Sequence, residues 1–189
     1  MKRFRFIATT IAFALVLAIM GFGVYAAVSP SFTISNQILF TPATEEARFY
    51  ATISTYTRET PTAELSEAID TVGVSWGVDE PVFTDPQTTL SDFEFAANRQ
   101  VYVLKIDITN LSGKDGMTVR VSGIPTAAGL EVTATQGATI DNGTATLDTT
   151  ITNGDNSVIE LNYRITDFTK PINITDHRLL VTLSVEDLT

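Results

Sequence analysis

Alternation of apolar and polar residues with a period of two runs through most of this 189-residue chain, and it constrains the fold more than any other feature. The clearest case is LKIDITNLSGKDGMTVRVSGIP at 104–125, where two alternating runs flank a Gly-containing turn. Side chains that alternate in this way point to opposite faces of a β-strand. The pattern predicts two strands joined as a hairpin, with Asp115-Gly116 in the turn.

The same alternation predicts strands at 31–40, 47–56, 72–78, 99–110, 117–124, 129–136, 138–151, 156–168 and 178–186. The run 138–151 is divided at Asn142-Gly143, a second hairpin signal. Only 62–70 has a helical composition, and we expect one or two helical turns there. Segment 80–92 contains two prolines and is expected to form a long loop. The sum is an all-β, antiparallel β-sandwich of immunoglobulin-like or jelly-roll type, forming a single domain over 27–189.

One face of each long strand is apolar, and we expect these faces to form the core of the sandwich. They carry Phe32, Ile34, Ile38 and Phe40; Phe49, Ala51 and Ile53; Tyr102, Leu104, Ile106 and Ile108; Ile159, Leu161, Tyr163 and Ile165; and Leu179, Val181, Leu183 and Val185. Lys105, Asp107 and Thr109 lie on the opposite face of their strand and are expected to point outward.

The first residues indicate export from the cytoplasm. A basic MKRFRF stretch precedes an uncharged apolar run at 7–28, and VYA at 24–26 fits cleavage before Ala27. Residues 1–26 are therefore predicted to be a secretory signal, or alternatively an uncleaved membrane anchor of sufficient length to span a bilayer. Both alternatives place the rest of the chain outside the cell or at its surface, and membrane contact would involve only residues 7–28.

Charge and cysteine content exclude several classes of function. The net charge is −10, and removal of 1–26 would leave nine basic residues against 22 acidic ones. Such an acidic surface repels nucleic acids, so we expect no nucleic-acid partner. The chain has no cysteine, which excludes disulfides and cysteine-ligated metal sites.

The residues that could perform catalysis are few. His177 is the single histidine, and Asp176 precedes it, but no G-x-S-x-G motif presents a nucleophilic serine. The adjacent carboxylates Glu45-Glu46 and Asp79-Glu80 would point to opposite faces of a strand, so neither makes a glycosidase pair. We expect no catalytic residues and no enzymatic activity, with His177 exposed before the last strand.

The sequence gives equally little support for a metal site or for a covalent cross-link. Oxygen-rich stretches at 141–144, 153–157 and 79–85 could hold calcium, but turn chemistry explains the same residues. An internal isopeptide bond from Lys105 is disfavoured, because Lys105 is predicted to face outward. We expect no metal site and no cofactor. Three glycosylation sequons begin at Asn110, Asn142 and Asn173.

Two stretches resemble known families. The segments YVLKIDITNLS, VRVSGIPTAAGLEV and NGDNSVIELNYRI, within 102–167, are similar to immunoglobulin-like repeats of bacterial surface proteins of the conserved-repeat and CARDB type. GFGVYAAVSPSFTISNQILFT resembles the start of small secreted Firmicutes proteins of the TasA and camelysin type, although those proteins usually carry an aromatic residue after the cleavage site. The second resemblance implies assembly into extracellular matrix fibres. Neither resemblance implies catalytic residues.

These observations predict a non-enzymatic structural or adhesive surface protein, with self-association, cell-surface proteins or polysaccharide as partners. Strand 31–40 would pair within its own sheet, or be donated to a neighbouring molecule to build a fibre. The alternative is a monomeric module that binds carbohydrate or protein. Trp76, Phe83, Phe93 and Phe95 are the only aromatic residues suited to a sugar-binding surface, and most of them are expected in the core.

Overall fold

The computed structural model describes residues 32–43, 46–77, 87–95, 100–135, 137–169 and 171–185, with only the backbone at 175 and 176. They belong to one compact unit over Ser31–Thr189. The predicted signal at 1–26 and the oxygen-rich stretch 79–85 lie outside these ranges. Nowhere in the described ranges is there a helix with the length and apolar character needed to cross a membrane.

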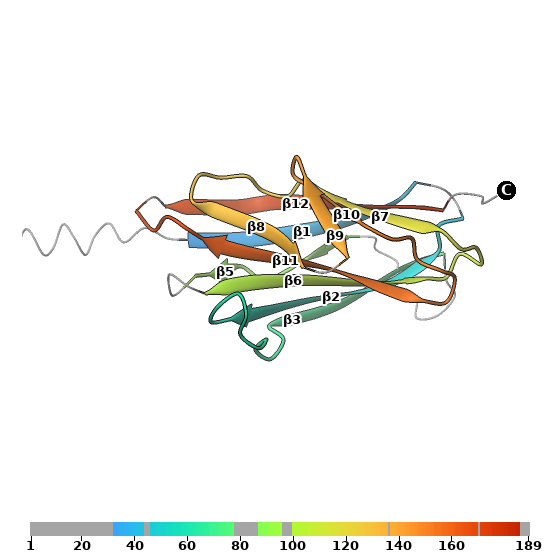
Figure 1. The fold of residues 1–189 in the computed structure, drawn as a ribbon, viewed down its shortest axis with the longest axis horizontal. Coiled ribbons are helices and arrows are strands. Elements are labelled where there is room, and N and C mark those ends of the chain that lie inside the picture. Colours follow the sequence, from blue (N-terminus) through green and yellow to red (C-terminus); the bar gives the residue numbers. More distant parts are fainter. Residues whose placement is uncertain are drawn as a thin grey trace, which may run out of the picture. The chain divides into compact units, whose positions relative to one another are not determined.

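The described residues form two β-sheets (Figure 1). Sheet A has the order β4 (Gln87–Thr89), β1 (Phe32–Pro42), β12 (Ile172–Val185), β7 (Met117–Ser122), β10 (Thr144–Leu147) and β9 (Ala138–Asp141), and β5 (Phe93–Glu94) also pairs with β1. Sheet B has the order β3 (Asp70–Trp76), β2 (Phe49–Arg58), β6 (Val101–Asn110), β11 (Asn156–Ile165) and β8 (Leu130–Thr135). The two sheets pack on each other, which confirms the all-β sandwich.

The core lies between the sheets and is built by the alternation. Every residue that was predicted on the apolar faces of the long strands is buried in one cluster. Burying a large aliphatic or aromatic side chain contributes about 2 kcal/mol, so these strands are held mainly by their inward faces. Lys105, Asp107 and Thr109 are only partly buried and face away from the core, as expected.

The predicted hairpin at 104–125 is wrong. β6 lies in sheet B between β2 and β11, whereas β7 lies in sheet A between β12 and β10. The turn around Asp115-Gly116 therefore carries the chain from one sheet to the other. A local turn sequence reverses the chain in either case, and the core decides whether the two strands pair. The second predicted hairpin is confirmed, since β9 and β10 pair around Asn142-Gly143, whose φ angles are 46° and 74°.

Three further expectations need correction. Residues 62–70 contain no helix, because the segment bends along β2 and is tied to it by backbone bonds from Ser66 to Thr57 and from Ile69 to Thr55. The loop predicted at 80–92 contains β4, which forms only because β1 offers it an edge. The pairing is also not wholly antiparallel, because β1 and β12 run parallel.

Candidate interaction surfaces

Strand β1 has one strongly paired side and one weakly paired side. Ten residue pairs join it to β12, from Phe32↔Ile172 to Pro42↔Leu183. On its other side β4 contributes three pairs and β5 two. The predicted strand 31–40 thus pairs within its own sheet in this structure, and the segment 87–95 covers its outer edge only in short pieces.

The inward face of β1 carries one polar residue that the sequence analysis passed over. Asn36 lies between the apolar residues Ile34 and Ile38, is 1% exposed, and its side-chain amide has no hydrogen-bond partner among the described residues. The hydroxyl groups of Tyr102 and Tyr163 are likewise buried without a well-formed hydrogen bond among the described residues, although the side chains of Asn36 and Thr55 interact weakly with the hydroxyl group of Tyr102. A single polar residue within an apolar alternation was the signal that could have marked this position.

The two tyrosines titrate above their ordinary range. Burial raises the pKa of Tyr102 to about 12, and the side chains of Asn36 and Thr55 act in the opposite direction. Complete burial is also the main reason that the pKa of Tyr163 is raised. The two rings pack against each other with centroids 5.7 Å apart. Both phenols are therefore neutral core side chains at ordinary pH.

His177 is not an exposed residue before the last strand, as predicted, but a half-buried residue within β12. Strand β12 begins at Ile172 because its first residues pair with the start of β1. The Nε2 atom of His177 is buried without a partner, and burial lowers the pKa of the imidazole, although a hydrogen bond with the backbone of Gly123 opposes this. The side chain of Asp176 lies outside the described residues.

The four aromatic residues considered for sugar binding do not form an exposed cluster. Phe95 is buried and Phe93 packs on the core, stacked on Tyr102 with ring centroids 4.7 Å apart. Trp76 is 40% exposed but lies at the end of β3, in the other sheet. Phe83 lies outside the described residues.

The oxygen-rich loops serve as turns in this structure. Residues 141–144 form the tip of the β9–β10 hairpin. In the other loop Asn153 accepts a hydrogen bond from the backbone of Gly113, and Asn156 donates one to Asp107. Within the described ranges, no three histidine or acidic side chains gather where they could ligate a metal ion. Glu46 forms an exposed ion pair with Lys114, whereas Glu45, Asp79 and Glu80 lie outside the described residues.

The first of the three sequons is inaccessible. Asn110 is fully buried, and its amide donates to the carbonyl oxygens of Lys114 and Ile151, while its Oδ1 accepts from Ser112. These bonds hold the crossing between β6 and β7 in place. The side chain of Asn110 is therefore fully used in stabilising this turn. By contrast, Asn142 and Asn173 are exposed.

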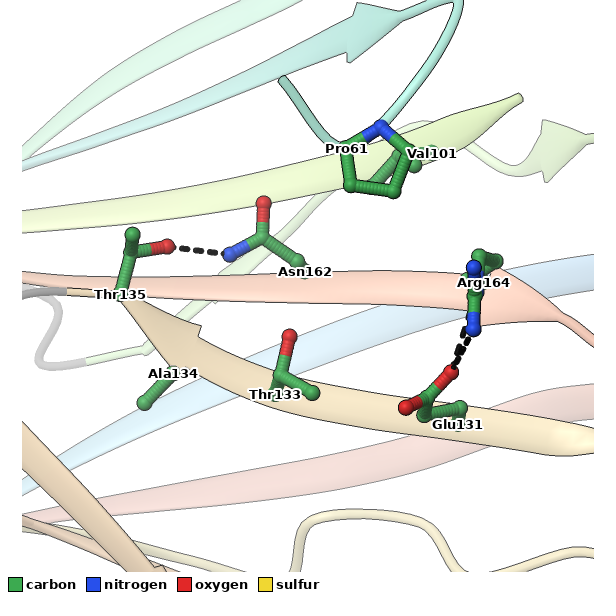
Figure 2. A pocket seen from close by; sticks show the side chains of 8 residues that line it. All are labelled: Pro61, Val101, Glu131, Thr133, Ala134, Thr135, Asn162 and Arg164. Carbon is green, nitrogen blue, oxygen red and sulfur yellow. Dashed lines mark hydrogen bonds and ion pairs between the residues drawn. The ribbon is translucent and has the colours of Figure 1, made fainter. Parts of the chain in front are cut away.

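A polar groove follows β11 on the outer face of sheet B. It consists of two hollows of about 270 Å³ and 600 Å³ that share Thr135. Figure 2 shows the smaller hollow, in which Thr133, Thr135 and Glu131 of β8 lie beside Asn162 and Arg164 of β11. Strand β8 forms one wall, and the segment after β2 forms the other.

Ion pairs hold the two walls of this groove. Arg58 of β2 pairs with Glu160 of β11, and Arg164 of β11 pairs with Glu131 of β8. The first pair is largely shielded from solvent, with side chains 12% and 18% exposed. Lys105 lines the larger hollow on the outward side of β6, as predicted, which removes it from the apolar interior that isopeptide formation requires.

No protein-family model matches the chain, and no curated protein is significantly similar to it. The resemblances to TasA, camelysin and CARDB-type proteins therefore stay predictions.

Proposed function

We propose that this chain is a non-enzymatic structural and adhesive protein of the cell surface or extracellular space, which self-associates into fibres by strand pairing. The observation that carries the proposal is the position of β1. Among the described residues it is the first strand of the sandwich, it supplies a row of buried residues, and the strands that cover its outer edge are short. The acidic, threonine-rich surface suits a protein that works in water outside the cell.

Exchange of β1 between copies would preserve almost every contact. Phe32, Ile34, Ile38 and Phe40 of one copy would fill the same core positions in the next, in the same register against β12. The chain between Pro42 and Phe49 would be the hinge. Because the exchanged contacts equal the original ones, the equilibrium depends on protein concentration and hinge strain, as in domain swapping. A head-to-tail exchange whose rotation does not close into a ring produces a fibre.

The segment 87–95 would control access to this exchange. Strands β4 and β5 are only three and two residues long, and short edge strands are a common way of blocking pairing with other chains. Their few backbone bonds make them easy to displace. A copy that has lost β4 and β5 from the edge of β1 presents a free strand edge to a neighbour.

A disulfide lock tests the proposal directly, because the chain has no cysteine of its own. Gln37 of β1 and Thr89 of β4 are directly paired, so Q37C/T89C would fasten β1 to its cover within one molecule. The matched control is S54C/T71C, which joins β2 to β3 in sheet B at positions whose hydroxyl oxygens are 3.3 Å apart. Assembly of residues 27–189 would be followed by light scattering and electron microscopy.

We expect the wild type, the reduced lock and both redox states of the control to form fibres as concentration rises. The oxidised lock should remain monomeric. Fibres from the oxidised lock would show that β1 stays in place during assembly. A wild type that stays monomeric under all conditions would remove the fibre function and leave the monomeric binding module as the surviving alternative.

A further inference from the structure

We propose that the groove along β11 binds a neutral polysaccharide chain. The groove lies on the outer face of sheet B, whereas β1 belongs to sheet A, so the inference is independent of fibre assembly. The outward residues Val158, Glu160, Asn162 and Arg164 form its floor in sequence. From Val158 to Arg164 the strand extends for about 20 Å, which gives a polymer several repeats in contact at once.

The walls of the groove come from segments that are far apart in the sequence. Pro61 faces the smaller hollow together with Val101, and Ala63, Glu64 and Leu65 line the larger one. This segment shields the outer face of β6, where Val101 and Val103 are 1% and 0% exposed although they lie outside the core cluster. Arg58 donates a hydrogen bond to the carbonyl oxygen of Pro61, which fixes this wall in place. The groove therefore has a defined shape in the folded protein.

Charge balance indicates the class of ligand. The chain as a whole has a net charge of −10, but the two hollows are lined by three basic residues and three acidic ones. The basic residues are Arg58, Lys105 and Arg164, and the acidic ones are Glu64, Glu131 and Glu160. Anionic and cationic ligands would each meet a like charge along the groove. A neutral ligand rich in hydroxyl groups meets donors and acceptors of both kinds.

The backbone argues against a peptide strand as the occupant. β11 is paired on both sides, with β6 and with β8, so the floor offers side chains and no free backbone edge. Peptide recognition by strand addition needs such an edge, together with pockets for side chains. The groove instead offers hydroxyl, amide and charged groups, among them the side chains of Thr133 and Lys105, which have no partner among the described residues.

None of the described residues that line the groove is aromatic, so each site would bind weakly. A long polymer of one repeating unit offers a single groove many linked, equivalent positions along its length, which raises the apparent affinity per polymer molecule even for an unassembled protein. A repeating neutral polymer is therefore a better match for this groove than a single small sugar.

The test is affinity electrophoresis of the full chain in native gels that contain dextran, mannan or soluble starch, with polygalacturonate as the anionic control. A nonionic detergent without a sugar headgroup keeps the chain in solution. Carrying the oxidised Q37C/T89C lock in all samples keeps fibre assembly out of the measurement. Mobility is expressed relative to a gel without polysaccharide, which cancels the charge differences between variants.

K105M/T133V is the informative variant, since neither side chain makes a bond within the described protein and the fold should not depend on them. Thr109→Val is the control, because Thr109 lies on the outward side of β6 but does not line either hollow. We expect retardation by at least one neutral polysaccharide, and a dissociation constant about tenfold higher for the double variant, as loss of two hydrogen bonds implies.

Polygalacturonate should not retard the chain. Thr109→Val should be retarded as strongly as the Q37C/T89C protein without further substitutions. Failure of all three neutral polysaccharides to retard the protein would overturn the inference. Equal retardation of K105M/T133V would overturn it as well, because binding would then occur elsewhere. Stronger retardation by polygalacturonate than by the neutral polymers would contradict the charge argument.

Discussion

Asn36 and His177 occupy matched positions on the parallel strands β1 and β12, directly after a shift in the pairing register. Each has a buried polar atom without a hydrogen-bond partner among the described residues. The shift arises because β12 uses three steps, from Ile174 to His177, where β1 uses two, from Ile34 to Asn36. The hydrogen bonding of β1, the strand proposed to exchange, is therefore least complete near its middle.

Asn36→Leu should stabilise the protein. The substitution removes a buried amide that makes no well-formed hydrogen bond among the described residues, only a weaker contact with Tyr102. Because it keeps a side chain of similar size, the free energy of unfolding should rise by about 1–3 kcal/mol. Urea unfolding followed by tryptophan fluorescence measures the change. Asn36→Asp is the opposite control, because it places a carboxylate in the core and should destabilise. A lower stability for Asn36→Leu would show that the amide is hydrogen-bonded in solution.

His177 should make stability decrease on acidification. Burial lowers the pKa of His177 in the folded state below its usual 6.5, so the unfolded chain binds the proton first as the pH falls. The free energy of unfolding should fall as the pH drops through about 6.5, and the fall should end below the folded pKa. Urea unfolding between pH 8 and 5 on wild type and His177→Gln isolates the effect. Parallel pH profiles for the two proteins would contradict it.

The buried tyrosines should make stability decrease at high pH. The pKa of Tyr102 is about 12 in the folded protein, against 10.0 for a tyrosine in an unfolded chain. The pKa of Tyr163 is also raised by folding. Above pH 10 the unfolded chain loses phenolic protons that the folded chain keeps, so stability should fall between pH 10 and 12. Tyr163→Phe should reduce this loss. Ultraviolet titration provides the check, since normal ionisation of all tyrosines near pH 10 in folded protein would refute the prediction.

Gly123→Ala should be strongly destabilising. Gly123 has a φ of +81°, and a Cβ atom there would lie 2.6 Å from the backbone oxygen of Arg178 on β12. Gly113 has a similar φ of +78° but open space around it. We expect Gly113→Ala to cost about 1 kcal/mol from backbone strain alone, and Gly123→Ala to cost several times as much. Thermal unfolding of the two variants tests this, and equal losses would show that strand β12 yields to the added methyl group.

Local alternation was sufficient to predict most strands and their inward faces. The residues of β6, β11 and β12 that were assigned to the core are all buried, because a period of two fixes the side of every residue once one face is apolar. Apart from the β9–β10 hairpin, the sequence could not reveal which strands pair. The segment 104–125 has hairpin chemistry, yet the two strands belong to different sheets, and only the packed core distinguishes these outcomes.

The candidate sites were harder to predict for the same reason. The groove is assembled from β2, β6, β8, β11 and the segment after β2, and its residues have no common motif. Strands β4 and β5 have little strand character of their own and depend on β1 for their hydrogen bonds. Asn110 matched a modification motif, and the structure shows that its side chain is occupied by the turn it holds.

Parallel pairing of β1 with β12 has a mechanical consequence. Phe32 and Ile172 lie at one end of the paired strands, and Pro42 and Leu183 lie at the other. A pulling force applied at Phe32 and at Val185 would act along the strands in opposite directions and load all ten pairs together in shear. Such a ladder cannot unzip one bond at a time, so the sandwich should resist tension along this axis far better than tension across its sheets.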